Sequence, residues 1–224
     1  VLNEIFKKNF KSYTFHNLYK ELLNFCTVDL SAFYFDIRKD TLYCSSFDSI
    51  ERKSCRTVMD ILFNSLTTWL APILCFTSEE AWQTRYKDPI NSVHLQNYFH
   101  ADKKWIDLEL STKWNKIRDL RLEVTSAMED KRKAGAIRSS LEAKITLNLN
   151  KENFNLMENL NLSEIFICSE VTLTTNSDDD ENITEVSIEK AEGEKCERCW
   201  KISINVDSES KLCPRCKTVI EFKS

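Results

Sequence analysis

The sequence predicts a mainly α-helical fold, in which an antiparallel helix bundle is followed by a small α/β junction and a cysteine-rich tail. Three observations support this prediction. Only two glycines and three prolines interrupt 224 residues, whereas turn-rich β folds depend on glycine for positive φ angles. Apolar residues recur at helical spacing through most of the first 133 residues. Beyond that point the period changes to the alternation that is typical of strands.

Helices account for the first hundred residues. Leucine and aromatic residues recur three and four positions apart in segments 16–26 and 51–70. Pro72 ends the second of these helices, because proline does not continue a helix. A Thr-x-x-Glu capping box at Thr77 predicts that another helix begins there. Long helices with short connections favour an antiparallel bundle, which we assign to residues 1–108.

A long helix and a small α/β unit follow the bundle. Residues 111–133 carry an apolar stripe and a basic end, and Gly135 is a suitable stop. The α/β junction, with the long helix, is assigned to residues 109–190. Within it, alternation predicts strands at 143–150, 165–175 and 183–191, with a short helix at 152–160.

No catalytic or membrane motif is visible. There is no run of 18 apolar residues, and the charged N-terminus is unlike a signal peptide, so we expect a cytoplasmic protein. Two glycines cannot build a phosphate-binding loop, no Gly-x-Ser-x-Gly motif is present, and the three histidines lie far apart. Because the sequence begins at Val1 rather than Met, we expect a piece of a longer chain.

Residues 191–224 contain two Cys-x-x-Cys pairs, separated by 13 residues. Each pair places two sulfurs on one turn, and two such turns complete a tetrahedron around Zn²⁺. Disulfides are disfavoured by the five other scattered cysteines, and a redox motif would need only one pair in a βαβ setting. Four thiolates leave no position for water, so the predicted zinc is structural. Its expected ligands are Cys196, Cys199, Cys213 and Cys216.

Basic residues surround these cysteines. Arg198, Lys201 and Arg215 lie in the same turns, and Trp200 directly follows the first pair. A small basic knuckle beside an aromatic side chain suits phosphate contacts and base stacking with RNA. In the alternative interpretation, Trp200 packs the knuckle onto the preceding domain.

Charge along the chain gives a weaker indication of the partner. Residues 101–150 carry 11 basic and 8 acidic side chains, whereas residues 151–224 carry 9 and 16. A basic middle favours a polyanionic partner, although a solvated helix face produces the same pattern.

Several motifs resemble one enzyme family. NFCTVDLSAFYFDIRKDTLYC and WLAPILCFTSEEAWQ resemble the anticodon-binding helices of class I aminoacyl-tRNA synthetases of the isoleucyl, valyl and leucyl group. WNKIRDLRLEVTSAMEDKRKAG, IRSSLEAKITL, and the terminal KCERCW and LCPRC narrow the resemblance to bacterial-type isoleucyl-tRNA synthetases. The resemblance covers essentially the whole chain.

The resemblance implies a specific role. The family joins a Rossmann catalytic core with an inserted editing domain to a helical anticodon domain and a zinc-binding region. Its His-Ile-Gly-His and Lys-Met-Ser-Lys-Ser signatures are absent here, so ATP, Mg²⁺ and isoleucine activation would belong to a core outside this chain. The expected partners are tRNA(Ile) and that core, with no membrane and a monomeric state. The four cysteines match the family's zinc ligands.

The same resemblance suggests residues for RNA contact. Arg138 departs from the glycine that we expect in many relatives, which adds a charge near the RNA. The full set of candidates is Arg118, Arg121, Lys131, Arg132, Lys133, Arg138, Arg198, Trp200, Lys201 and Arg215. Two alternatives remain: a zinc-ribbon module for protein–protein interaction, and the equivalent region of a valyl or leucyl relative.

Overall fold

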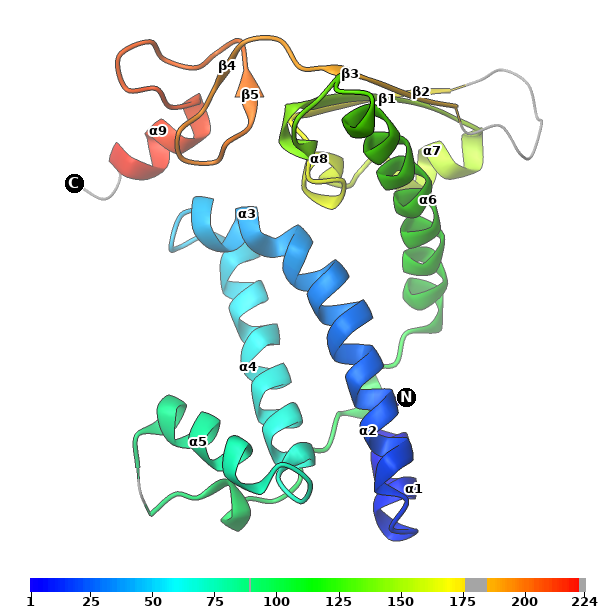
Figure 1. Ribbon diagram of the computed structural model, residues 1–224, viewed down its shortest axis with the longest axis vertical. Helices are drawn as coiled ribbons and strands as arrows, with labels where there is room; N and C mark the ends of the chain where they lie inside the picture. Colours follow the sequence, from blue (N-terminus) through cyan, green and yellow to red (C-terminus); the bar gives the residue numbers. More distant parts are fainter. Residues whose placement is uncertain (89, 176–184, 222–224) are drawn as a thin grey trace. The chain divides into compact units, whose positions relative to one another are not determined.

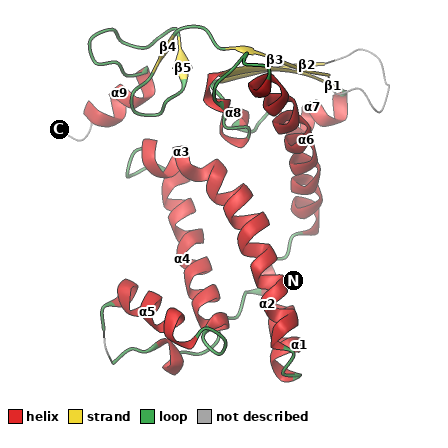
Figure 2. Ribbon diagram, viewed as in Figure 1, coloured by secondary structure: helices red, strands yellow, loops and turns green. Residues whose placement is uncertain are grey.

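Helices dominate the computed structural model, which describes residues 1–88, 90–175 and 185–221 (Figures 1 and 2). The chain divides into two compact units. The first comprises Val1–Asp36 and Phe47–Ile106, and the second comprises Ile37–Ser46 and Asp107–Ser224. The prediction of a mainly helical protein with a few strands is confirmed.

The regular elements in the described residues of the first unit are all helical. It contains α1 (Leu2–Lys11), α2 (Phe15–Asn24), the π-helix η1 (Phe25–Phe35), α4 (Ile50–Leu70), α5 (Cys75–Tyr86) and the 3₁₀ turns η2 (Val93–Leu95) and η3 (Lys103–Trp105).

Helices α2 and η1 run antiparallel to α4. The Tyr34 hydroxyl lies 3.7 Å from the Cys55 sulfur, while Leu18 shares an apolar cluster with Trp69. A residue late in η1 therefore meets the start of α4, and a residue early in α2 meets its end. Burial of this cluster excludes water from the helix faces and is the main stabilising term for the unit.

The second unit carries the strands and the four tail cysteines. It contains α3 (Asp36–Cys44, apart from its first residue), α6 (Leu108–Lys133), η4 (Ser140–Glu142), β1 (Ala143–Leu149), α7 (Lys151–Met157), α8 (Leu162–Ile165), β2 (Glu170–Thr175), β3 (Glu185–Lys190), β4 (Glu194–Lys195), β5 (Ile202–Ser203) and α9 (Pro214–Glu221).

Strand β1 is the centre of a three-stranded sheet of order β2-β1-β3, parallel to β2 and antiparallel to β3. Every second residue of β1 is buried, as the two-residue period of a strand requires. These side chains pack with one stripe of α6. The stripe consists of Ile117, Leu120, Val124 and Met128.

Helix α6 ends as its sequence predicts. Gly135 has φ +76°, and its N–H bonds to the Arg132 carbonyl at 3.1 Å while that of Ala136 bonds to the Lys131 carbonyl at 3.0 Å. This pair of bonds is a Schellman motif, for which glycine in the left-handed region is the preferred residue.

Two local predictions are wrong. The predicted strand at 165–175 begins only at Glu170, because Ile165 ends α8 and Ile167 turns the chain at φ +55°. Helix α5 begins at Cys75 rather than Thr77, because a turn after Leu70 leads directly into it and Leu74 occupies the capping position. Residues 183 and 184 of the third predicted strand lie outside the described residues.

Candidate metal centre and nucleic-acid interface

The structure gathers the four tail cysteines. Cys196 and Cys199 lie in the turn after β4, Cys213 directly precedes α9, and Cys216 lies in its first turn. All four sulfurs lie within 4.8 Å of one another, and those of Cys199 and Cys213 are 3.8 Å apart. Tetrahedral zinc with Zn–S bonds of about 2.3 Å would separate its sulfurs by about 3.8 Å. The donor set therefore fits a tetrahedral thiolate-bound ion.

Backbone N–H groups favour thiolate at this centre. The Cys213 N–H points at the Cys196 sulfur over 3.3 Å. Burial opposes ionisation of Cys196, but hydrogen bonds from the backbone of Cys199, Cys213 and Arg198 outweigh it and lower the pKa of this thiol to about 6. A thiol that ionises readily is a better metal ligand.

A glycine and an aspartate side chain stabilise the conformation of the tail. Gly193 has φ +107°, and an added Cβ would lie 2.3 Å from the Ser203 carbonyl carbon and oxygen, so glycine permits β4 to approach β5. The Asp207 carboxylate accepts hydrogen bonds from the backbone of Glu209 and Ser210, at 3.1 and 2.7 Å, and from Lys217 at 3.1 Å. These bonds hold the pKa of Asp207 well below its usual range and fix the loop between the two cysteine pairs.

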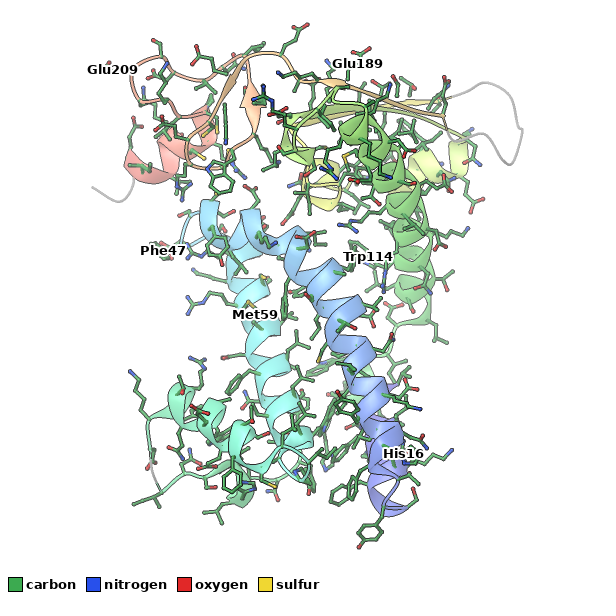
Figure 3. The ribbon with its side chains drawn as sticks, in the orientation of Figure 1. His16, Phe47, Met59, Trp114, Glu189 and Glu209 are labelled. Atoms are coloured by element: carbon green, nitrogen blue, oxygen red, sulfur yellow. The ribbon has the colours of Figure 1, made fainter. Side chains whose placement is uncertain are left out.

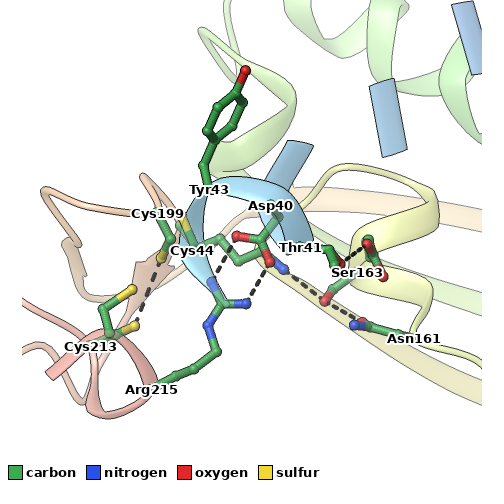
Figure 4. A network of polar contacts seen from close by, with 12 residues as sticks. Asp40, Thr41, Tyr43, Cys44, Asn161, Ser163, Cys199, Cys213 and Arg215 are labelled. Carbon is green, nitrogen blue, oxygen red and sulfur yellow. Dashed lines mark hydrogen bonds and ion pairs between the residues drawn. The ribbon is translucent and has the colours of Figure 1, made fainter. Parts of the chain in front are cut away.

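Two arginines join the cysteine-rich tail to α3. Arg215 donates to both carboxylate oxygens of Asp40, at 2.5 and 2.7 Å (Figure 4). Arg198 donates to the carbonyls of Cys44 and Tyr43, at 2.6 and 3.1 Å. A cation on the last carbonyls of a helix satisfies groups that have no partner within the helix and suits the helix dipole.

A buried carboxylate joins α3 to α8. Glu164 is only 7% exposed and accepts two hydrogen bonds of 3.2 Å from Arg38. The Thr41 hydroxyl also donates to this carboxylate. A buried charge is tolerated only when it is paired and hydrogen-bonded, so these contacts fix α3 against α8.

The RNA-contact candidates on α6 differ in how far their side chains already bind other groups of the chain. The Arg121 guanidinium donates to the Ile165 carbonyl at 2.8 Å, and Arg132 forms a two-bond pair with Glu129. Lys133 lies 3.9 Å from Asp130. Lys131 is exposed at the helix end, whereas Arg118 is half-buried and takes part in contacts of its own. Lys131, Arg132 and Lys133 thus form one exposed basic helix end.

The remaining candidates lie on the junction and tail. Arg138 is exposed, and its backbone N–H is held by Glu142 at 3.0 Å. Lys201 donates to the Ser163 hydroxyl at 2.9 Å. Trp200 is 59% exposed, with the Lys195 ammonium 5.2 Å from the centroid of its ring. Its φ of +65° turns the chain directly after the first cysteine pair.

Sequence reasoning missed the part of α3 that receives the arginines. Asp40, Tyr43 and Cys44 precede their arginine partners by more than 150 residues. In the sequence Asp40 belongs to the polar face of a helix, and nothing local distinguishes it from a solvated charge.

Comparison with known proteins identifies the class. The family described as the anticodon-binding domain of tRNA ligase matches residues 1–147, so the chain belongs to this family. The chain is 49% identical over 202 residues to an isoleucine–tRNA ligase of Pelagibacter ubique. This match covers 90% of the chain and 22% of that protein. For the isoleucine–tRNA ligase of Gluconobacter oxydans the identity is 42% over 206 residues, covering 91% of the chain and 21% of that protein.

The similarity is therefore to a part of these ligases: the chain spans about a fifth of the length of the curated relatives that it matches. The chain is also 40% identical over 227 residues to the isoleucine–tRNA ligase of Brachyspira hyodysenteriae. This match covers 97% of the chain and 24% of that protein. In the described part of the chain, no helix has the length and apolar character needed to cross a membrane.

Proposed function

We propose that this chain binds the anticodon stem-loop of tRNA(Ile) as part of an isoleucine–tRNA ligase. The observation that carries the proposal is the match of residues 1–147 to the anticodon-binding family, together with relatives that are isoleucine–tRNA ligases over almost the whole chain. Ligation of isoleucine with ATP and Mg²⁺ would belong to the remainder of the full-length protein. The five cysteines outside the four-cysteine cluster remain as thiols, which supports the reducing, cytoplasmic location that we propose.

The proposed cofactor is one structural zinc ion, held by the four tail cysteines. The close approach of their sulfurs and the N–H groups directed at Cys196 support this assignment. The tail has few buried apolar side chains besides the cysteines, and small domains of this kind depend on a metal for folding. We propose residues 191–224 as the zinc ribbon, 109–190 as the junction and 1–108 as the anticodon-binding bundle.

The proposed RNA surface combines the basic end of α6 with the exposed part of the tail. Lys131 and Arg138 offer charge for phosphate contact, and the exposed ring of Trp200 offers a face for stacking. Arg198 and Arg215 already bind α3. For these two arginines we favour a role in holding the tail in place over direct contact with RNA.

Binding of the zinc-loaded chain to tRNA(Ile) and to an unrelated tRNA tests the proposal. Affinities would be measured with and without a chelator, at two salt concentrations. We expect preference for tRNA(Ile), loss of affinity on chelation, and a steep fall with salt, because phosphate contacts release counterions. Equal binding of both tRNAs, unaffected by the chelator, would place recognition of tRNA(Ile) outside this chain.

A further inference from the structure

A basic groove lies on the first unit, remote in sequence from the tail. It has a volume of about 520 Å³ and is lined by one face of α4 and by Arg85 of α5. Met59, labelled in Figure 3, is one of its apolar lining residues. The volume is within the range of about 300–1,000 Å³ that is typical of small-molecule and cofactor sites. None of its cations is among the RNA-contact candidates that the sequence suggested.

The groove carries an excess of positive charge. Lys53, Arg56 and Asp60 are three and four positions apart on α4, so they share a face of the helix. Arg85 pairs with Asp60 across the groove. Three cations and one carboxylate thus line it, and within residues 1–88, 90–175 and 185–221 no acidic side chain forms an ion pair with Arg56. Lys53 pairs outside the groove with Asp48, at 3.1 Å.

We infer that this groove holds a backbone phosphate of the bound RNA, with Arg56 as its principal ligand. The inference rests on the proposed function. Guanidinium groups bind phosphate oxygens with two parallel hydrogen bonds, and the exposed Arg56 side chain is able to do so. The groove lies within the residues that match the anticodon-binding family. Phosphate is the shared chemistry of RNA and free nucleotides, and membership of this family favours RNA as the source.

The contact positions the RNA and does not read its sequence. The apolar lining residues offer no hydrogen-bonding group for a base edge, and the hydroxyl of Thr57, which also lines the groove, already donates to the Lys53 carbonyl at 3.0 Å. Phe63 stacks on Trp82 with ring centroids 6.2 Å apart. Phosphate contacts fix register and orientation, whereas base contacts carry specificity. Loss of Arg56 should therefore weaken binding of tRNA(Ile) and of an unrelated tRNA by the same factor.

The test compares Arg56→Glu and Arg56→Lys with the control Lys20→Glu, a charge reversal on an exposed face of α2. Each zinc-loaded chain is titrated with tRNA(Ile) at several salt concentrations. We expect Arg56→Glu to weaken binding about tenfold and to reduce the salt slope by about 1. Arg56→Lys keeps the charge but cannot form two parallel hydrogen bonds, so its affinity should lie between those of Arg56→Glu and the unmodified chain. Lys20→Glu should change the affinity less than about twofold.

Two results would overturn the inference. One is binding of tRNA(Ile) to Arg56→Glu with unchanged affinity and salt slope. The other is saturable binding of 5′-AMP that Arg56→Glu abolishes while tRNA binding is unchanged, since the groove would then serve a free nucleotide. If the unmodified chain does not bind tRNA(Ile) at all, the proposed function itself fails, and this outcome is distinguishable because it needs no variant.

Discussion

Arg215 and Asp40 form a two-bond ion pair between residues 175 positions apart in the sequence, with N–O distances of 2.5 and 2.7 Å. The Asp40 side chain is 19% exposed and that of Arg215 is 42% exposed. Burial opposes ionisation of Asp40, but the hydrogen bonds and charge of Arg215 outweigh it and lower the pKa of this carboxyl. The pair therefore stabilises the attachment of the tail to α3.

Replacement of Arg215 by alanine should weaken this attachment. We expect a loss of about 1–2 kcal/mol in the free energy of unfolding, between the values typical of exposed and buried pairs, measured by urea denaturation with zinc present. Arg132→Ala is the matched control, because Arg132 makes the same two-bond contact to Glu129 within one exposed helix turn. Equal losses for the two variants would show that Arg215 is an ordinary surface residue.

Removal of one tail thiol should release the metal and unfold the tail. In Cys216→Ser we expect less than one zinc per chain by elemental analysis, and rapid proteolysis within residues 191–221, because the buried cysteines are the centre of the tail's small apolar cluster. Cys75→Ser, at an exposed cysteine in α5, serves as the control. Full zinc content in Cys216→Ser would exclude the four-cysteine site.

The two glycines should differ sharply in their tolerance of alanine. At Gly193 a new Cβ would lie 2.3–2.4 Å from backbone atoms of Ser203 and Ile204, whereas at Gly135 it meets nothing within 4 Å. Both have positive φ, so Gly135→Ala should cost only about 1 kcal/mol. Gly193→Ala should cost about 3 kcal/mol or more, since backbone must move. Thermal unfolding of both variants provides the measurement, and similar melting temperatures would contradict the close approach of β4 and β5.

Much of the local structure was visible in the sequence. The alternation of β1 specified its buried face, and the spacing of the cysteine pairs specified which four sulfurs would meet. The apolar residues of α8 and the strand that follows could not be separated by period alone, because short apolar runs suit both helix and strand. The left-handed turn at Ile167, where the two elements separate, has no glycine to mark it.

The anchoring of the tail could not be predicted for a different reason. It depends on which helix end lies beside the cysteines, and that is a property of tertiary packing. Charge and position in the sequence predict RNA contact for Arg198 and Arg215, yet both are held by α3. Charge alone does not distinguish an arginine that binds a partner from one that binds its own chain.

Glu79 should make the first unit sensitive to acid. Its carboxylate accepts hydrogen bonds from Gln83 at 2.9 Å, Ser92 at 2.8 Å and the Val93 N–H at 2.9 Å, and these lower its pKa. A carboxyl whose pKa is lower in the folded than in the unfolded chain stabilises the fold above the unfolded value of about 4.3, and loses this effect as pH falls.

The expected result is a pH-dependent difference between Glu79→Gln and the unmodified chain. The variant should be less stable at pH 7, and the difference should shrink steadily as the pH falls from 5 toward 3. Thermal unfolding across this range measures it, with Glu80→Gln as a control at the neighbouring exposed carboxylate. A difference that is constant with pH would mean that Glu79 acts by packing and not by charge.

Replacement of Trp200 separates the two interpretations of this side chain. Its ring is 59% exposed, so truncation removes little buried area, and Trp200→Ala should leave the melting temperature almost unchanged. If the ring stacks on a base, affinity for tRNA(Ile) should fall by about 1–3 kcal/mol, while Trp200→Phe should retain most of it. A variant that melts several degrees lower but binds tRNA(Ile) normally would instead assign Trp200 to packing. The affinity for tRNA(Ile) would then come from the charged side chains at the end of α6. The salt slope of Trp200→Ala would equal that of the unmodified chain.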